Sequence, residues 1–449
     1  MLMNTVKRLL PSTLLFLPVR PIIMFLLMSG LLSGCQHFPS LFPDDAKVLN
    51  PSVSEQVSVV DKHEFTLARD QALFGSLATI TVKDNDTLPD IARHFGLGYN
   101  DISMANPSIA AWTPTPGSQV LLPLQFILPD SPRKGITLNL ANMRLFYYPK
   151  QTPDKVFTYP VGIGRDGWNT PTGLLKIISK TANPSWNVPE SIQREHARKG
   201  DALPAVVRAG PNNPLGNYAM RLTVSHYLIH GTNKPYGIGM QVSHGCVQLY
   251  PENIETLFEK ITIGTPVQIV HQPYLTAWHE GMLYLEANKP LQNHKQSKMQ
   301  LMKQLRQLSS KKHATIDWKK VERVLDRADG VPTPILENSP DIAEITRNAL
   351  PLKHPDYFNH QPVIEAIKAD DWAIRVADFK DETKAQQLVT MLNHQGPIIP
   401  ARKVAKDHAF QVIAGPFKNK TEVLAVAKRI RMDFELKAEP LKPGQILVN

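Results

Sequence analysis

Proline interrupts this chain throughout, with 38 prolines among 449 residues. A typical chain carries about 5% proline. Proline fixes the backbone and removes a hydrogen-bond donor, so it breaks helix interiors. The sequence therefore favours short strands, turns and linkers over a helix bundle. At about 150 residues per domain, the length is enough for roughly three domains.

Two cysteines, Cys35 and Cys246, are too few for a disulfide framework, a four-thiolate zinc site or an iron–sulfur cluster. A single bridge between them remains open. Cys35 ends the motif Leu32-Ser33-Gly34-Cys35, which follows basic residues and an apolar run of about fourteen residues. That run is shorter than the ~20 residues that cross a bilayer and is typical of a signal peptide. A membrane anchor that happens to carry a cysteine is the alternative.

The motif resembles a bacterial lipobox, in which the cysteine is acylated and becomes the new N-terminus. The resemblance implies a signal peptide over residues 1–34, lipidation of Cys35 and a tether over residues 35–65. It also implies attachment to the periplasmic face of the outer membrane, where a multiply acylated cysteine would hold the chain firmly. Cys246 would then be the one free thiol.

The net charge of +10 raises the question of an anionic partner. Ten basic and two acidic residues lie between Lys289 and Arg323, so the rest of the chain is closer to neutral. The charge therefore gives no reason to expect nucleic-acid binding. We expect residues 276–365 to form a basic, Pro-rich linker with two short helices, at Lys298 to Leu308 and at Asp317 to Arg327. This linker would be a spacer or would touch an anionic envelope polymer.

Residues 66–130 show a β-α-α-β pattern, in which a threonine and a proline favour the start of the first helix. The motifs of this segment are Asp86-Thr87-Leu88, Ile91-Ala92, Phe95-Gly96, Asn106 and Val120-Leu-Leu-Pro123. They resemble a LysM domain. The resemblance implies binding of N-acetylglucosamine polymers, with Asp86, Thr87 and Asn106 as glycan-binding candidates. A packing module without a ligand is the alternative.

Residues 133–275 change to short β runs divided by glycine and proline, which is typical of a sandwich or barrel-like β domain. One helix is expected from Pro251 to Lys260. The sequence Gly162-Ile-Gly-Arg-Asp-Gly167 matches the G-x-G-x-x-G pattern of dinucleotide sites. Such a site needs a helix directly after the glycines, and the proline-containing sequence that follows favours a hairpin loop instead.

Residues 366–449 contain an internal strand–helix repeat. Trp372 to Phe379 and Phe410 to Phe417 are the two related strands, each followed by a helical stretch. The repeat resembles a SPOR domain, a module that binds glycan strands stripped of peptides at division sites. The resemblance implies Trp372, Phe379 and Phe417 as glycan-binding candidates, and enrichment at the division site. A generic α+β interaction module is the alternative.

Cys246 lies in Ser243-His-Gly-Cys246, sixteen residues after His230. A cysteine nucleophile acts as the thiolate, and a nearby cationic histidine or helix N-terminus lowers the thiol pKa. We expect both features here, because His230 ends a predicted strand and a helix begins near Pro251. A buried inert cysteine and a zinc site of His226, His230, His244 and Cys246 are the alternatives.

Four segments together closely resemble the L,D-transpeptidase (YkuD) family: Asn213-Pro-Leu-Gly216, Ile229-His-Gly-Thr-Asn233, Gly237-Ile-Gly239 and Val242-Ser-His-Gly-Cys-Val247. The resemblance implies a multidomain chain in which a mainly β catalytic domain, an L,D-transpeptidase β-sandwich, is flanked by a LysM module and an α+β SPOR domain. It implies that Cys246 is the nucleophile and His230 the general base. Ser243 and His244 would shape the site, and Gly245 with the Cys246 backbone N–H would form the oxyanion hole. Substrate-binding candidates are Gly231, Thr232, Gln241 and Gln248.

The family cleaves the bond between meso-diaminopimelate and D-Ala in a peptidoglycan tetrapeptide stem through a thioester, then transfers the peptide to an amine. The acceptor is another diaminopimelate or the C-terminal lysine of an outer-membrane lipoprotein, and no cofactor or metal is expected. Close relatives carry Arg where this chain has Gln241 and Gln248, which leaves the substrate preference open. A hydrolase on the same site and a septal glycan-binding scaffold are the alternative functions.

Overall fold

The computed structural model describes residues 60–198, 200–291, 298–358, 361–394, 396–406 and 408–445. All of these residues belong to the unit from Gln56 to Asn449. The predicted signal peptide, the lipidation candidate Cys35 and most of the tether lie outside the described residues. Within the described ranges, no helix is long and apolar enough to cross a membrane.

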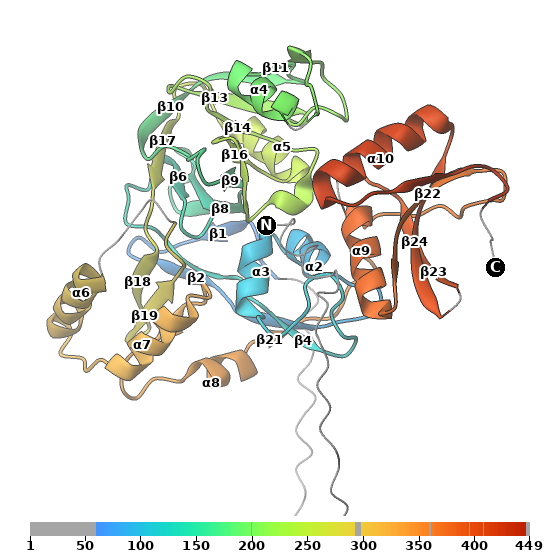
Figure 1. The fold of residues 1–449 in the computed structure, drawn as a ribbon. Helices are drawn as coiled ribbons and strands as arrows, with labels where there is room; N and C mark the ends of the chain where they lie inside the picture. The colour runs from blue at the N-terminus through green and yellow to red at the C-terminus, as the bar shows by residue number, and fades with distance from the viewer. Residues whose placement is uncertain are drawn as a thin grey trace, which may run out of the picture. The chain divides into compact units, whose positions relative to one another are not determined.

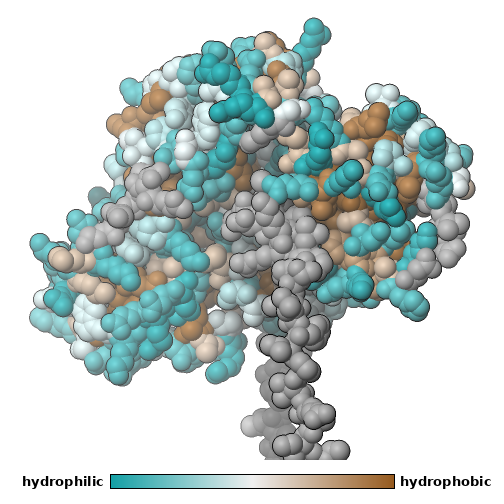
Figure 2. All heavy atoms as spheres, viewed as in Figure 1, coloured by the Kyte–Doolittle hydropathy of each residue, from teal (hydrophilic) through white to brown (hydrophobic). Residues whose placement is uncertain are grey.

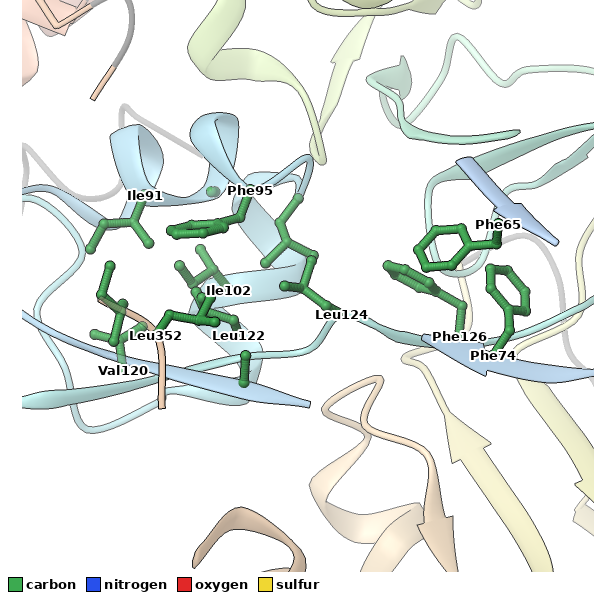
Figure 3. Packing of buried hydrophobic residues seen from close by; sticks show 14 of the residues in the cluster. Phe65, Phe74, Ile91, Phe95, Ile102, Val120, Leu122, Leu124, Phe126 and Leu352 are labelled. Carbon is green, nitrogen blue, oxygen red and sulfur yellow. The ribbon is translucent and has the colours of Figure 1, made fainter. Parts of the chain in front are cut away.

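The LysM-like segment folds in the order β3 (Ala78–Thr81), α2 (Leu88–His94), α3 (Tyr99–Ala105) and β4 (Gln119–Leu122), with β3 antiparallel to β4. Helix α2 begins where the sequence predicts, because the Thr87 hydroxyl accepts a hydrogen bond from the Asp90 N–H and a proline occupies the first turn. Apolar side chains of both helices and both strands form the core, as Figure 3 shows: Ile91, Phe95, Ile102, Val120 and Leu122.

Two short strand pairs flank this module. Strand β2 (Leu73–Gly75) pairs with β5 (Gln125–Ile127), and β1 (Glu64–Thr66) pairs with β8 of the catalytic domain. Phe65, Phe74 and Phe126 pack against one another, with ring centroids 4.9–6.2 Å apart (Figure 3). The same core includes catalytic-domain side chains, so the two modules share apolar packing.

The catalytic domain is built on a nine-stranded sheet in the order β1-β8-β7-β6-β17-β10-β13-β14-β16 (Figure 1). Its further strands are β6 (Gly135–Asn139), β7 (Arg144–Tyr148), β8 (Lys155–Pro160), β10 (Gly173–Ala182), β13 (Tyr218–Leu222), β14 (Leu228–His230), β16 (Val247–Gln248) and β17 (Pro266–Val270). Neighbours are antiparallel except for the pairs β6–β17 and β14–β16. Helix α5 (Pro251–Lys260) lies where the sequence predicts and buries Ile254 and Leu257 in the core of this sheet.

Three further features of the catalytic domain lie near the sheet. Strand β9 (Ile163–Gly164) pairs in parallel with β15 (Gln241–Ser243). The G-x-G-x-x-G segment therefore continues into a turn, not into the helix that a dinucleotide site needs. Between β10 and β13 the chain forms β11 (Trp186–Asn187), α4 (Glu190–Arg198) and β12 (Val206–Val207).

Residues 276–365 differ from the linker that the sequence predicts. They include the end of β18 (Tyr274–His279). They also contain β19 (Met282–Ala287), α6 (Lys298–Lys311), α7 (Trp318–Arg327), β20 (Thr333–Pro334), α8 (Ile342–Arg347) and β21 (Leu350–Pro351). Leu301 and Leu305 of α6 and Val321 and Val324 of α7 lie at helical spacing and are buried together. Strand β21 then pairs in parallel with β3, which places Leu352 in the LysM core. These segments therefore form a folded part of the chain.

The C-terminal domain has the order β22 (Trp372–Phe379), α9 (Glu382–His394), β23 (Ala401–Lys406), β24 (Ala409–Phe417), α10 (Lys420–Phe434) and β25 (Glu439–Leu441). Its four strands form an antiparallel sheet in the order β23-β24-β22-β25 (Figure 1). On the face shown in Figure 2, the described surface is mainly hydrophilic, with hydrophobic side chains in separate patches.

Charged and polar contacts join the LysM module to the catalytic domain. Arg93 forms a two-pronged ion pair with Glu252 at 2.8–2.9 Å, and Arg144 pairs with Asp101 at 2.7 Å. The Tyr250 hydroxyl donates to the Leu97 carbonyl at 3.1 Å. Both arginines are buried and their carboxylate partners are only partly exposed, so solvent screens the ion pairs less than it screens pairs at the surface.

Candidate active site

Strands β14 and β16 bring the His230 and Cys246 motifs side by side. They pair in parallel, with Ile229 opposite Val247 and His230 opposite Gln248. Ile229 and Val247 are buried in the core. Because side chains alternate along a strand, His230 and Cys246 lie on the other face. Ideal strand geometry, with strands ~4.8 Å apart and a rise of ~3.3 Å per residue, would set the two Cα atoms ~8 Å apart.

Ser243 holds the turn that carries the cysteine. Its buried hydroxyl donates to the Cys246 carbonyl at 2.5 Å and accepts from the Gly245 N–H at 3.1 Å. Gly245 has φ +102°, and a Cβ there would lie 2.7 Å from the Tyr227 ring. Only glycine fits this position without strain. The Thr170 hydroxyl donates to the Gly245 carbonyl at 2.9 Å and fixes the other side of the turn.

His230 is buried as a neutral ring. Its Nδ1 lies 2.6 Å from the Gly231 carbonyl oxygen, and because a carbonyl only accepts, Nδ1 carries the proton and Nε2 is unprotonated. Burial lowers the pKa of His230 to about 4, against the carbonyls of Gly231 and Leu215, which favour the protonated ring. At neutral pH the imidazole is therefore ready to accept a proton.

Cys246 is partly buried, and its thiol lies 3.6 Å from the His226 carbonyl oxygen. Burial raises the pKa of the thiol, while the backbone of Leu228 and the charge of Arg221 act in the opposite direction. This balance differs from the lowered pKa that the sequence predicts. The neighbouring His230 is neutral, so it supplies no positive charge, and desolvation disfavours the thiolate. The resting pair is a thiol and a neutral imidazole.

His244 belongs to a polar network that the sequence motifs do not reveal. Its Nε2 lies 3.1 Å from Glu195 of α4 and 2.9 Å from Arg165, and Arg165 pairs with Glu195 at 2.7 Å. The Trp168 ring packs edge-on against the His244 ring at 4.9 Å. A cavity of about 520 Å³ opens beside this network, lined by Trp168, Ser191, Arg194, Ala197 and Arg198. No spacing rule links residue 195 to residue 244, so only the fold could show this contact.

The comparisons with known proteins agree on this region. The family model described as the L,D-transpeptidase catalytic domain matches residues 133–269, the LysM model matches residues 80–123 and the SPOR model matches residues 368–437. The chain is 42% identical over 223 residues to the probable L,D-transpeptidase ErfK/SrfK of Escherichia coli, which covers 49% of this chain and 71% of the relative. The chain belongs to the L,D-transpeptidase family.

The matches to two other relatives cover more of each relative's length. The chain is 37% identical over 264 residues to the probable L,D-transpeptidase YcfS of Escherichia coli, covering 57% of this chain and 82% of YcfS. It is 37% identical over 281 residues to ErfK/SrfK of Salmonella typhimurium, covering 60% of this chain and 90% of that relative. The catalytic domain of an Enterococcus faecium L,D-transpeptidase is 21% identical, with a TM-score of 0.25, over 31% of this chain and 99% of that structure.

The substrate-binding candidates of this L,D-transpeptidase lie in two kinds of place. Gly231 and Thr232 are buried, and the Thr232 hydroxyl accepts a hydrogen bond from the Lys234 N–H at 2.9 Å. Both residues therefore help to fix the backbone that follows His230. Gln248 is partly exposed on the face that carries His230 and Cys246. Gln241 is partly exposed on β15. In the part of the chain that the structure describes, no three His, Cys, Asp or Glu residues gather as a metal site would require.

The glycan-binding candidates of the LysM module are mostly buried. Thr87 caps α2, and the Asp86 carboxylate accepts from the Lys83 N–H at 2.6 Å and lies 2.9 Å from the His354 ring. The Asn106 amide makes three hydrogen bonds of 2.8 Å to the backbone of Ile102 and Leu121. These three residues therefore organise the module, and their side chains have little surface to offer a glycan.

In the SPOR domain, Phe379 and Phe417 are buried, and Trp372 is partly buried. Trp372 lies opposite Phe417 across the β22–β24 pair. The two phenylalanines therefore pack inside the domain, and only Trp372 of this set reaches the surface.

Proposed function

We propose that this enzyme is a peptidoglycan L,D-transpeptidase whose Cys246 attacks the diaminopimelate–D-Ala bond of a tetrapeptide stem and transfers the acylated peptide to an amine. The single observation that carries the proposal is the β14–β16 pair, which places His230 and Cys246 on one face of neighbouring strands. Family membership and the named relatives support the reaction class.

The proposed reaction runs in two halves. The Cys246 thiol gives its proton to His230 Nε2 as sulfur attacks the carbonyl carbon, and the oxygen becomes an oxyanion. The intermediate then breaks the C–N bond, His230 returns the proton to the leaving D-Ala amine, and a thioester remains. In the second half an acceptor amine attacks the thioester, and its proton returns through His230 to the sulfur. The Gly231 carbonyl holds His230 in the required tautomer.

The oxyanion needs a preorganised donor. The Gly245 N–H already donates to Ser243, so we assign the role to the Cys246 N–H in the turn that Gly245 and Ser243 shape. His244, held by Glu195 and Arg165, would line the same site. A neutral resting pair fits this route, because the proton transfer is made when the substrate is in place.

The other modules would hold the substrate and place the enzyme. We assign glycan binding to the LysM and SPOR modules, and enrichment at the division site to the SPOR module. Lipidation at Cys35 would attach the protein to the periplasmic face of the outer membrane. The acceptor would be a second stem peptide or a lysine-terminated lipoprotein. The β-sandwich class that the family resemblance implies stays a proposal, and the nine-stranded sheet fits its mainly β character.

Mass spectrometry of the products tests the reaction. The full chain and its Cys246→Ala and Cys35→Ser variants would be incubated with tetrapeptide-rich peptidoglycan. We expect new 3-3 cross-links, or peptide joined to added lipoprotein, from wild type and Cys35→Ser, and none from Cys246→Ala. Tripeptides alone would show a hydrolase, and the absence of any Cys246-dependent product would overturn both enzyme functions and leave the scaffold.

A further inference from the structure

Arg221 presents an unpaired positive charge on the sheet face that carries the nucleophile. It lies on β13, opposite Leu228 of β14, while Met220 lies opposite Ile229. Met220 and Ile229 are both buried, so the residues on either side of them point to the opposite face. Arg221 of β13, His230 of β14 and Cys246, which directly precedes β16, therefore share that face of the sheet.

The guanidinium of Arg221 is available to a ligand. The residue is exposed, and across the residues that the structure describes no ion pair or hydrogen bond of its side chain is formed. Two other arginines of the same domain differ in this respect, because Arg165 pairs with Glu195 and Arg194 pairs with Glu190. The charge of Arg221 is also close enough to lower the pKa of the Cys246 thiol, although burial outweighs it.

The substrate that the proposed function assigns to this site carries carboxylates next to the bond that breaks. The leaving D-Ala ends in one, and diaminopimelate carries another on its side chain. A carboxylate pairs favourably with a cation, and the planar fork of arginine matches both of its oxygens. The chain has glutamine at positions 241 and 248, where the resemblance places arginines.

We propose that Arg221 binds a carboxylate of the donor stem peptide. From β13, on the other side of β14, it would supply the charged contact that the uncharged Gln248 cannot make. This inference rests on the proposed function and adds a specificity determinant to it. Because β14 lies between β13 and β16, a stem peptide lying across this face would pass His230 and Cys246 with its carboxylate toward Arg221.

The test compares carboxylate and amide substrates. Acyl-enzyme formation would be measured by mass spectrometry for wild type, Arg221→Gln and Arg221→Lys, with a tetrapeptide, its C-terminal D-Ala amide and its diaminopimelate side-chain amide. We expect Arg221→Gln to reduce kcat/KM on the free tetrapeptide roughly 10- to 100-fold, as for loss of a charged hydrogen bond. On one of the two amides, wild type and Arg221→Gln should have the same kcat/KM. The carboxylate that this amide replaces is the one that Arg221 binds. Arg221→Lys should retain part of the preference.

Two further variants serve as controls. Arg323→Gln removes an exposed arginine of α7, outside the catalytic domain, and should leave kcat/KM unchanged on the tetrapeptide and on both amides. Gln248→Arg added to Arg221→Gln should restore the carboxylate preference. An Arg221→Gln enzyme that slows equally on the free acid and on both amides would show a structural role only and overturn the inference. Inactive wild type would instead overturn the proposed function.

Discussion

Lowering the pH from 7.5 to 5.0 should weaken the strands that carry the site, because His230 is buried as a neutral ring. Its pKa falls from 6.5 to about 4 on folding. A histidine with a depressed pKa contributes its full stability above pH 6.5 and loses it as the pH falls through the folded value. The loss reaches about 2 kcal/mol at pH 5.0 and about 3 kcal/mol at pH 4.

Hydrogen exchange of peptides covering residues 218–257 measures this effect locally, which avoids treating a multidomain chain as a two-state system. We expect wild-type protection, corrected for the intrinsic pH dependence of exchange, to fall roughly 30-fold more between pH 7.5 and 5.0 than that of His230→Asn. His63 is also buried with a pKa of about 4, so the variant, and not the wild-type slope alone, isolates His230.

The matched control is His226→Asn. His226 is exposed with φ +69°, a conformation that asparagine tolerates. This variant should keep the wild-type pH response. An equal pH response in wild type and His230→Asn would refute the reasoning, because it would mean that the His230 ring reaches water or titrates in place.

Three further outcomes follow from individual contacts. Ser243→Ala removes the two hydrogen bonds that hold the turn, and we expect kcat/KM for acylation to fall at least 10-fold, since small displacements of a nucleophile are costly; a wild-type rate would exclude a positioning role. Asn106→Ala leaves buried backbone groups unpaired and should lower the free energy of unfolding of the LysM module by about 3 kcal/mol. Exposed Asp84→Ala should not lower it, and equal effects of the two variants on hydrogen exchange of peptides covering residues 78–122 would contradict this account. Burial raises the pKa of Glu286 to about 7. The protonated side chain contributes its full stability below pH 4.5, and this contribution is lost as the pH rises through 7. The loss is about 3 kcal/mol at pH 8.5. Glu286→Gln should therefore make the free energy of unfolding less sensitive to a rise in pH from 5 to 8.5, and an unchanged slope over that range would count against it.

Local signals in the sequence were enough to predict several elements. Thr87 and Pro89 mark the start of α2, and the strand–helix repeat after Asp371 gives the order of the C-terminal elements. Such signals work because capping and alternation depend on residues only a few positions apart. The catalytic pairing of His230 and Cys246 stays a prediction from the motifs, and the β14–β16 register shows that their two segments are neighbours in the sheet.

Long-range packing was beyond the reach of those signals. Residues 276–365 include a basic segment and many prolines, so their composition predicts a linker. Their core forms only when α6 and α7 pack against β19, and local sequence signals do not indicate that packing. The contacts of His244 with Glu195 and Arg165 join segments separated by 49 and 79 positions. The direction of the Cys246 pKa also depends on burial, and burial is a property of the fold.

Arg93, Asp101 and Tyr250 hold the LysM module against the catalytic domain at a set distance. A glycan strand bound by that module could not offer every stem peptide it carries to Cys246. Only a peptide at the matching interval along the polymer would reach the thiol. The spacing of the products along the wall would then be set by the protein's own dimensions, where a flexible tether would give a broad distribution.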